Sequence, residues 1–160
     1  MIDLHSHILP ELDDGSYSLQ ESLAMARMAV DSGVTVMAAT PHCADARAKE
    51  VYESWKMLRQ ALKECRIPLK LFPGMEIFGS FDTARLLREK KLLTLNGSRY
   101  PLIEFSFYTD GTAETEILQT VIDAGYTPLV AHPERYEYIH QQPELINQWK
   151  KMGCLFQVNR

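Results

Sequence analysis

The sequence has no surplus of basic residues, no long apolar segment and few cysteines. Its formal charge of −4 argues against nucleic acid as a partner. Without a long apolar stretch, secretion and membrane insertion are both disfavoured, and we expect a cytoplasmic protein. The three cysteines, Cys43, Cys65 and Cys154, cannot form a closed set of disulfides and do not have the spacing of a zinc knuckle. We therefore expect reduced thiols.

What the sequence does contain is a regular alternation of strand-like and helix-like segments. Short apolar runs predict strands at residues 2–5, 34–39, 68–73, 101–105, 127–131 and 155–158. The helices predicted between them lie at about residues 18–32, 44–65, 81–91, 113–124 and 143–152. The first helix opens with a capping box from Ser18 to Glu21, and Gly33 is placed to end it.

This alternation implies parallel strands joined by right-handed crossovers, in one domain spanning residues 1–160. A closed barrel normally takes ~200–250 residues. The predicted fold class is therefore α/β, a distorted β/α (TIM-like) barrel that is incomplete at its C-terminal end. The open strand edges of such a barrel invite association, so a homo-oligomer is also expected. Functional sites of these folds lie at the carboxyl ends of the strands.

Four of the five histidines follow or end predicted strands. His5 and His7 are two residues apart, which in an extended strand places both side chains on one face. His42 and His132 each end a short apolar run beside a proline. A single buried histidine is more often a hydrogen-bonded core residue, but here the pattern repeats. Because neutral imidazole is the commonest nitrogen ligand for zinc, iron and manganese, we predict a metal site. His140, in a polar stretch, is expected to be exposed.

Two glutamates lie at equivalent places. Glu76 follows a predicted strand and a glycine, and Glu104 interrupts the apolar run at residues 102–105. A carboxylate in such a run is costly unless it is paired or bound to a metal. A salt bridge to an arginine is the alternative for Glu104. Its position among the strand-end histidines favours metal ligation, and Glu76 is suited to bridge two ions.

Two further positions point to catalysis. Asp13-Asp14-Gly15 follows the first histidine pair, and although Asp-Gly is an ordinary turn signal, we select Asp14 as a ligand or proton donor. Arg135 follows His132 by three residues, and its planar guanidinium suits a phosphate or carboxylate. The alternative for Arg135 is an ion pair with Glu134 or Glu137.

Cys154 and Arg160 have the spacing found in thiol-dependent tyrosine phosphatases. That chemistry needs a glycine-rich loop ahead of a helix, which lowers the pKa of the thiol. Here the intervening residues are apolar and strand-like. We therefore interpret Cys154 as a small buried residue.

In combination, these motifs resemble the bacterial PHP-type tyrosine-protein phosphatases, manganese-dependent enzymes tied to capsular and exopolysaccharide synthesis. The resemblance covers essentially the whole chain, in order. It is carried by the opening Leu4-His5-Ser6-His7 with Asp13-Asp14-Gly15, and by Thr40-Pro41-His42, Gly74-Met75-Glu76-Ile77, Leu95-Asn96-Gly97-Ser98, Leu102-Ile103-Glu104-Phe105 and His132-Pro133-Glu134-Arg135.

The resemblance implies a PHP barrel with up to three divalent ions at its mouth, manganese first and iron or zinc as alternatives. It also implies the phosphotyrosine tail of a partner tyrosine kinase as the substrate. The matching positions assign Asp14 to the cluster, Arg135 to the phosphate, and the metal ligands to six residues: His5, His7, His42, Glu76, Glu104 and His132.

Two departures from the family pattern stand out. Cys43 replaces a histidine that commonly follows Thr-Pro-His, and a late Asp-x-His metal motif has no counterpart. We therefore expect either a fragment of a longer protein or a degenerate member.

The leading function is metal-dependent phosphomonoester hydrolysis without a cysteine nucleophile. In this interpretation Asp14, or a metal-bound water, protonates the leaving tyrosine oxygen, and the metal charge and Arg135 stabilise charge on the phosphoryl group. Two alternatives stay open: a small-molecule phosphatase of the histidinol-phosphate type, and a non-catalytic metal-binding regulatory module.

Overall fold

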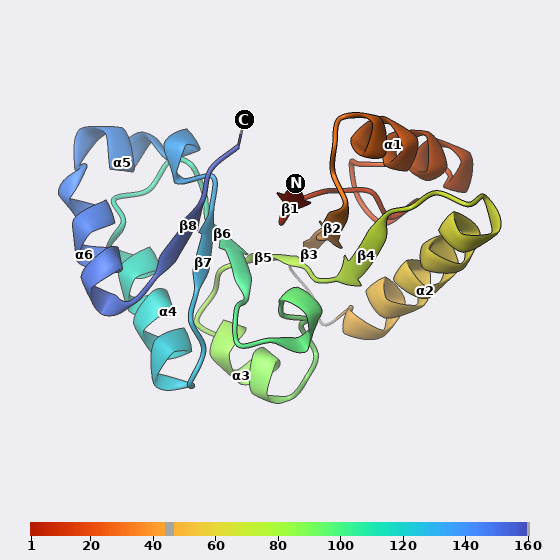
Figure 1. The fold of residues 1–160 in the computed structure, drawn as a ribbon. Coiled ribbons are helices and arrows are strands. Elements are labelled where there is room, and N and C mark those ends of the chain that lie inside the picture. Colours follow the sequence, from red (N-terminus) through yellow and green to blue (C-terminus); the bar gives the residue numbers. More distant parts are fainter. Residues whose placement is uncertain (44–46, 160) are drawn as a thin grey trace.

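The computed structural model of the protein describes residues 1–43 and 47–159, and within these ranges all paired strands are parallel (Figure 1). One sheet has the strand order β1-β2-β4 and the other the order β3-β5-β6-β7-β8. The strands are β1 (Ile2–Asp3), β2 (Val36–Ala39), β3 (His42–Cys43), β4 (Lys70–Pro73), β5 (Glu76–Phe78), β6 (Leu102–Glu104), β7 (Leu129–Ala131) and β8 (Leu155–Gln157).

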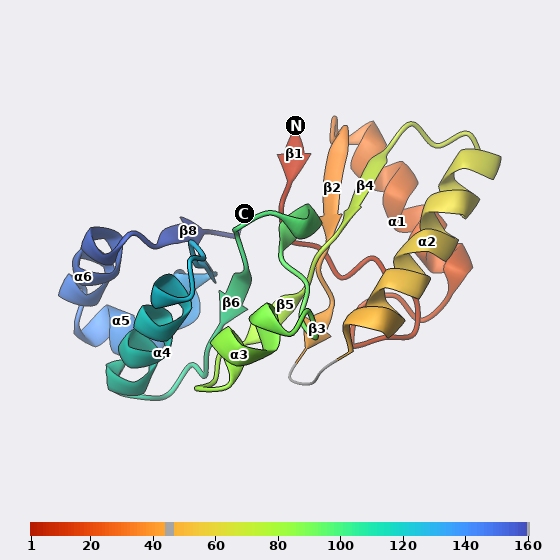
Figure 2. The ribbon, with the colours of Figure 1, turned by 90° about the horizontal axis from the view of Figure 1, so that it is seen from below.

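Helices connect the strands and cover the sheets. In Figure 2, α1 and α2 lie together against the sheet that contains β2 and β4, while α4 and α6 lie beyond β6 and β8. The α-helices are α1 (Leu19–Asp31), α2 (Ala48–Glu64), α3 (Thr83–Arg88), α4 (Thr112–Asp123), α5 (Glu137–Gln141) and α6 (Glu144–Met152), with 3₁₀ turns η1 (Leu95–Gly97) and η2 (Pro133–Arg135).

The helix ends follow the local chemistry of the sequence. The Ser18 hydroxyl accepts a hydrogen bond of 3.2 Å from the backbone N–H of Glu21, whose carboxylate accepts one of 2.7 Å from the N–H of Tyr17. This is the predicted capping arrangement of α1. Gly33, with φ of +88°, follows α1, and Gly153, with φ of +105°, ends α6. Both have the left-handed backbone that favours glycine.

The two sheets are continuous through two chain segments. β2 leads into β3 across Thr40 and Pro41, and β4 leads into β5 across Gly74 and Met75. A side chain at Gly74 would come within 3.0 Å of Leu95 and 3.1 Å of Thr40, so the crossing point is tightly packed. Beyond this point the strand register places His42 opposite Glu76. It also places Phe78 opposite Glu104.

The predicted α/β class with parallel strands is confirmed, whereas closure of a barrel is not seen. β1 and β8 are end strands of different sheets, and no described strand pairs with both. The end of β8 nevertheless lies beside the segment that follows β1, because Gln157 Oε1 is 2.8 Å from His5 Nδ1. The strand ends of both sheets therefore surround a common region without a continuous ladder of hydrogen bonds.

Several element boundaries were predicted wrongly. β1 ends at Asp3, so His5 and His7 follow the strand rather than belong to it. The segment 81–91 contains a shorter helix, because Lys90 has a positive φ of 56° and breaks it. The short strands β3 and β5 and the helix α5 were not predicted. The first three residues of the helix predicted at 44–65 lie outside the described residues.

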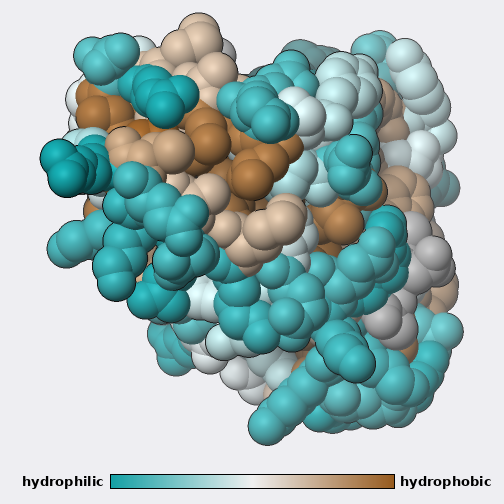
Figure 3. Space-filling model, turned by 90° about the vertical axis from the view of Figure 1, so that its right-hand side faces the viewer, coloured by the Kyte–Doolittle hydropathy of each residue, from teal (hydrophilic) through white to brown (hydrophobic). Residues whose placement is uncertain are grey.

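None of the helices in the described ranges is long and apolar enough to cross a membrane. The side of the molecule that carries α1 and α2 displays a patch of apolar atoms bordered by hydrophilic side chains (Figure 3). Exposed methionines on these helices include Met28 on α1 and Met57 on α2.

Candidate metal centre

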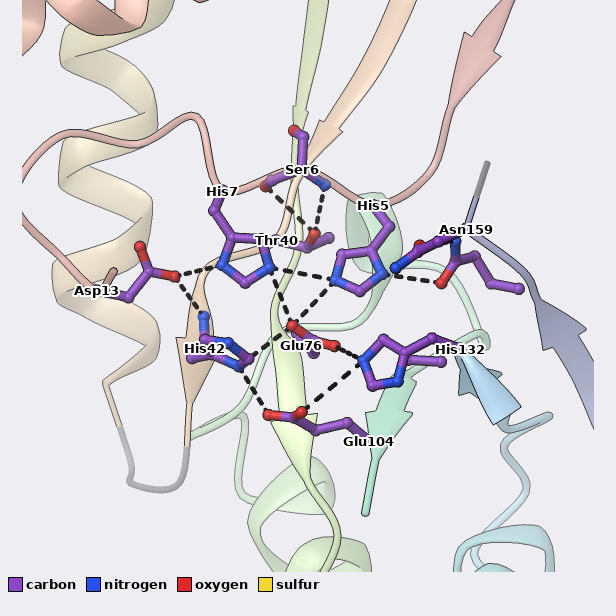
Figure 4. A network of polar contacts seen from close by, with 12 residues as sticks. His5, Ser6, His7, Asp13, Thr40, His42, Glu76, Glu104, His132 and Asn159 are labelled. Atoms are coloured by element: carbon purple, nitrogen blue, oxygen red, sulfur yellow. Dashed lines mark hydrogen bonds and ion pairs between the residues drawn. The ribbon is translucent and has the colours of Figure 1, made fainter. Parts of the chain in front are cut away.

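All six predicted metal ligands line one cavity at the carboxyl ends of the strands. They reach it from five separate parts of the chain, and their side chains converge on Glu76 (Figure 4). His5 and His7 follow β1, His42 lies in β3, Glu76 opens β5, Glu104 ends β6 and His132 follows β7.

Glu76 is the centre of this arrangement, and its side chain is 1% exposed. Its Oε2 lies 2.9 Å from His5 Nε2, 3.0 Å from His7 Nε2 and 3.1 Å from His42 Nδ1. None of these contacts has hydrogen-bond geometry, and Oε2 has no hydrogen-bond partner within the described ranges. Its Oε1 accepts a hydrogen bond of 2.6 Å from His132 Nε2. A buried carboxylate oxygen thus lies among several ring nitrogens.

The charge of Glu76 is maintained by these neighbours. Burial by itself would raise the pKa of the carboxyl group, because it penalises the charged form. Contacts with His132, His5 and His7 outweigh burial and hold the pKa of Glu76 well below its usual range. Glu76 is therefore an anion in the folded protein at neutral pH.

The rings of His5 and His7 are oriented by partners on their outer nitrogens. His5 Nδ1 donates a hydrogen bond of 2.8 Å to Gln157 Oε1, and His7 Nδ1 donates one of 2.6 Å to Asp13 Oδ2. In the neutral ring this leaves Nε2 as the lone-pair nitrogen. The two Nε2 atoms lie 3.2 Å apart beside the Glu76 carboxylate. Two lone pairs and one anion directed at one point form a typical donor set for a divalent cation.

Three groups of side chains have ligand atoms within 4.8 Å of one another. Each shares one member with each of the others, so the groups form a continuous cluster. The groups are His5, His7 and Glu76; His7, Asp14 and His42; and His42, Glu76 and Glu104. The donor chemistry therefore fits metal ions at more than one position.

Asp13, which the sequence analysis did not select, holds residues of the cluster in place from outside the cavity. Its carboxylate also accepts hydrogen bonds from the backbone N–H groups of His42, at 2.8 Å, and Gly15, at 3.0 Å. Burial would raise the pKa of Asp13, but the contacts with His7 and these backbone groups lower it. Asp13 was missed because the sequence Asp13-Asp14-Gly15 predicts a turn but does not show which of the two carboxylates points inward.

Asp14 lies at the mouth of the cavity, with a side chain that is 79% exposed. Its Oδ1 is 3.7 Å from His42 Nε2 and 3.8 Å from His7 Nδ1. Gly15 permits this placement, since a Cβ there would lie 2.2 Å from the carbonyl oxygen of His7. The loop thus directs Asp13 towards His7 and His42, and Asp14 towards the opening of the cavity.

Glu104 pairs with a histidine rather than with an arginine. His42 Nδ1 donates a hydrogen bond of 2.7 Å to Glu104 Oε1. This bond is the main reason why the pKa of His42 is raised. No arginine contacts Glu104 in the described part of the chain, so the salt-bridge alternative is not seen.

His132 is 3% exposed and contacts the cluster through Glu76. It belongs to none of the three ligand groups, and its Nδ1 is buried without a hydrogen-bond partner among residues 1–43 and 47–159. The backbone of His132 is left-handed, with φ of 32° and ψ of 54°. Such a conformation is uncommon for a residue with a side chain and is typical of functional sites.

Tyr136 connects the ends of β6 and β7, and no motif in the sequence indicates this role. Its buried hydroxyl accepts a hydrogen bond of 3.0 Å from the N–H of Phe105 and donates one of 2.8 Å to the carbonyl of Ala131. These partners directly neighbour Glu104 and His132 in the sequence. The Tyr136 ring also lies edge-on to the His132 ring, with 5.8 Å between centroids.

Arg135 lines the same cavity and is exposed. Within the described residues it makes no ion pair with Glu134 or Glu137, which was the alternative reading of the sequence. Phe107 and Asn159 also line the cavity, and both were missed because neither lies in a metal-binding motif.

The described cysteines lie outside the cavity lining, and none of them forms a disulfide. Cys154 is buried, and burial raises the pKa of its thiol to about 11. At neutral pH this group is a thiol, not the thiolate that a cysteine phosphatase requires. Arg160, its partner in the spacing motif, lies outside the described residues. His140 is exposed, as predicted.

Comparison with known proteins identifies the family. The sequence profile for "Capsular polysaccharide synthesis, CpsB/CapC" matches residues 1–160. The chain is 34% identical to the tyrosine-protein phosphatase CpsB of Streptococcus pneumoniae, over 99% of this chain and 67% of that protein. It is 36% identical to the tyrosine-protein phosphatase YwqE of Bacillus subtilis (strain 168), over 99% of this chain and 64% of that protein.

A solved structure agrees with this relationship. It comes from work on YwqE from Bacillus subtilis and CpsB from Streptococcus pneumoniae, described as unique metal-dependent tyrosine phosphatases. It superposes with a TM-score of 0.91 at 35% identity, covering 99% of this chain and 66% of that one. The chain thus spans about two thirds of the length of the relatives it matches. It belongs to the CpsB/CapC family of capsular polysaccharide synthesis.

Proposed function

We propose that this chain carries the metal-binding and phosphate-binding part of a metal-dependent protein-tyrosine phosphatase. The observation that carries the proposal is the convergence of three histidine nitrogens on the buried Oε2 of Glu76. The names of its relatives support the same activity. We propose His5, His7, His42, Glu76, Glu104 and His132 as the metal ligands.

We propose manganese as the ion, with iron or zinc as alternatives. Histidine nitrogens combined with carboxylate oxygens suit each of these metals. When bound, a divalent ion would supply the positive charge that activates a water molecule and neutralises phosphoryl oxygens. The chain's own contribution is to hold the donor atoms in place through Asp13 and Gln157.

Two exposed side chains at the opening complete the proposed mechanism. Arg135 binds the phosphoryl oxygens of the substrate with a guanidinium that no described carboxylate occupies. Asp14, close to His42 and His7 at the mouth, donates a proton to the tyrosine oxygen as it leaves. Cys154 takes no part, since its thiol is buried and protonated.

We propose phosphotyrosine on a tyrosine kinase of polysaccharide synthesis as the physiological substrate, which the family description supports. We propose the cytoplasm as the compartment of this reaction, which is supported by three cysteines that form no disulfide. For the fold, we propose that residues 1–160 form part of a PHP-type barrel, supported by strand ends that surround one site.

The test measures metal content and phosphatase activity together. The purified protein is loaded with Mn²⁺, and turnover of a phosphotyrosine peptide is followed with and without a chelator. Glu76→Gln should abolish both metal binding and turnover. Glu114→Gln, which changes another buried glutamate on α4 outside the cavity, is the matched control and should retain both.

Other outcomes separate the alternatives. Metal binding without turnover of any phosphomonoester would favour the non-catalytic regulatory module. Turnover of small alkyl phosphates with none of the peptide would favour the small-molecule phosphatase. Unchanged metal content in Glu76→Gln would contradict the site assignment itself.

A further inference from the structure

The cavity that holds the histidine and glutamate cluster has one aromatic hydrocarbon side chain in its lining, that of Phe107. The other lining residues in the described part of the chain are polar or charged, apart from Gly15. Polar side chains can bind a phosphoryl group and metal ions, whereas a phenyl ring has no hydrogen-bonding group or ligand atom for either. The position of Phe107 beside the cluster therefore favours a ligand that has an apolar part as well as an anionic one.

The ring of Phe107 is held in place by two residues next to the cluster. It lies edge-on to His132, with 6.0 Å between centroids and 82° between planes. It packs on Tyr136, also at 6.0 Å, with 33° between planes. The carbonyl of Phe107 accepts a hydrogen bond of 3.0 Å from the N–H of Glu137. The ring and its backbone are therefore both fixed relative to the strand ends.

Tyr108 extends the aromatic surface outward. Tyr108 is 82% exposed. Its ring centroid is 6.5 Å from that of Phe107, with 69° between the ring planes. Because the Tyr108 side chain is so exposed, it can change its orientation without disturbing the packing of the fold. Phe107 lines the cavity, and the exposed ring of Tyr108 lies next to it outside that lining. We call these two rings the aromatic edge.

We propose that the aromatic edge binds the phenyl ring of a phosphotyrosine substrate and so sets the preference for aryl over alkyl phosphates. The inference rests on the proposed phosphatase function and specifies its substrate recognition. A phosphoryl group held between the cluster and Arg135 brings the ring bonded to it beside Phe107. Aromatic pairs prefer centroid distances of 4.5–7 Å, and a substrate ring can meet Phe107 and Tyr108 within that range. Phosphoserine carries no ring and gains nothing from this edge.

The test compares ligands that share an anionic head and differ in the ring. Binding of phenylphosphonate and methylphosphonate to the Mn²⁺-loaded protein is measured by calorimetry, and kcat/KM is measured on matched phosphotyrosine and phosphoserine peptides. The variants are Phe107→Leu and Tyr108→Ala. Phe81→Leu, which makes the same change at an exposed phenylalanine outside the cavity lining, is the matched control.

We expect Phe107→Leu to weaken phenylphosphonate binding by several-fold to about tenfold, the size of an aromatic pair contact. Methylphosphonate binding should stay unchanged. On the phosphotyrosine peptide the loss should appear in KM more than in kcat, with a smaller loss in Tyr108→Ala and none in Phe81→Leu. An equal loss for both phosphonates would show that Phe107 only supports His132 and would overturn the proposal, as would no loss for either.

The phosphonate measurement keeps this inference separate from the proposed function. A wild-type protein that hydrolyses no phosphomonoester would contradict the proposed function. The difference in binding affinity between phenylphosphonate and methylphosphonate would still test whether the aromatic edge binds a ring, since neither ligand has to be hydrolysed.

Discussion

His7 and Asp13 are joined by a hydrogen bond of 2.6 Å between Nδ1 of the ring and Oδ2 of the carboxylate. The same oxygen accepts the backbone N–H of His42 at 2.8 Å. One carboxylate therefore orients two of the proposed ligands from outside the cluster. Partners of this kind fix the ring orientation of a metal-binding histidine and raise its basicity.

Asp13→Asn should therefore weaken metal binding while leaving the fold intact. The amide retains the size of the side chain but loses the negative charge that orients His7. Groups that hydrogen-bond to metal-binding residues typically contribute 10- to 100-fold to the metal affinity. Titration with Mn²⁺ by calorimetry measures the change. Asp82→Asn changes an exposed aspartate that is paired with Arg85 and does not line the cavity, and this variant should bind metal as the wild type does. Wild-type affinity in Asp13→Asn would show that His7 is oriented by other groups.

The metal-free protein should lose stability as the pH rises from about 6.5 towards 10. Burial lowers the pKa of His7, but the hydrogen bond to Asp13 and the close contact with the Glu76 carboxylate outweigh it and raise the pKa from 6.5 to about 10. A raised histidine pKa contributes stability that is complete below the unfolded value and lost as pH passes through the folded value. Melting temperatures in chelator across this range test the trend.

His7→Gln should flatten this pH profile, and His140→Gln, which removes an exposed histidine elsewhere, should not change it. At low pH the opposite sign applies to Glu76, whose lowered pKa contributes stability that is lost as the pH falls below about 4.5. A profile for the chelated wild type that is flat above pH 6.5 would contradict the assigned His7–Asp13–Glu76 contacts.

Arg135→Ala should reduce catalysis without reducing stability. The residue is exposed and has no carboxylate partner among the described residues, so its removal should leave the melting temperature nearly unchanged. Loss of a charge-assisted contact made in the transition state should cost about 2–4 kcal/mol, or tens- to several-hundred-fold in kcat/KM. Arg85→Ala is the control for an exposed arginine. A lower melting point with normal kinetics would show that Arg135 is structural.

Tyr136→Phe should destabilise the strand ends that carry Glu104 and His132. The change keeps the ring but leaves the N–H of Phe105 and the carbonyl of Ala131 without their hydroxyl partner. Unpaired buried groups cost roughly 1–3 kcal/mol, so the melting temperature should fall and metal should be held less tightly. Tyr126→Phe, in the turn before β7, is the control. An unchanged melting temperature would mean that water replaces the hydroxyl.

Cys154→Ser should have little effect on turnover, and thiol reagents should inhibit weakly in the folded state. Burial raises the pKa of this thiol to about 11, so a reactive thiolate is scarce at neutral pH. Phosphatase assays with and without a chelator decide the matter. Activity that survived the chelator but not the substitution would reverse the proposed chemistry.

The positions of the cluster residues were predictable because each lies at or shortly after the end of a predicted strand, and the carboxyl ends of parallel strands meet at one edge. The residues that support the cluster were harder to predict. The choice between Asp13 and Asp14 depends on how Gly15 packs against His7, which local sequence does not reveal. Gln157 reaches His5 across 152 positions of sequence, and no pattern connects the two.

The same limit applies to the fold. The strand His42–Cys43 is too short for periodicity to reveal, and it exists because Glu76 and Ile77 pair with it. Tyr136 and Phe107 looked like ordinary core and loop aromatics, since only the three-dimensional structure brings them beside His132. Alternating helices and strands predicted the class of fold, while long-range pairing determined how its sheets are divided.

The central place of Glu76 has a consequence for how the protein acquires its metal. Its neighbours in space come from widely separated parts of the chain, from His5 to His132, so the unfolded polypeptide has no preformed chelating site. Parallel strands with such distant partners assemble late and slowly. Ion uptake should therefore follow folding, and added Mn²⁺ should raise the melting temperature in proportion to the logarithm of its concentration by binding only the native state. It should leave the early rate of refolding unchanged.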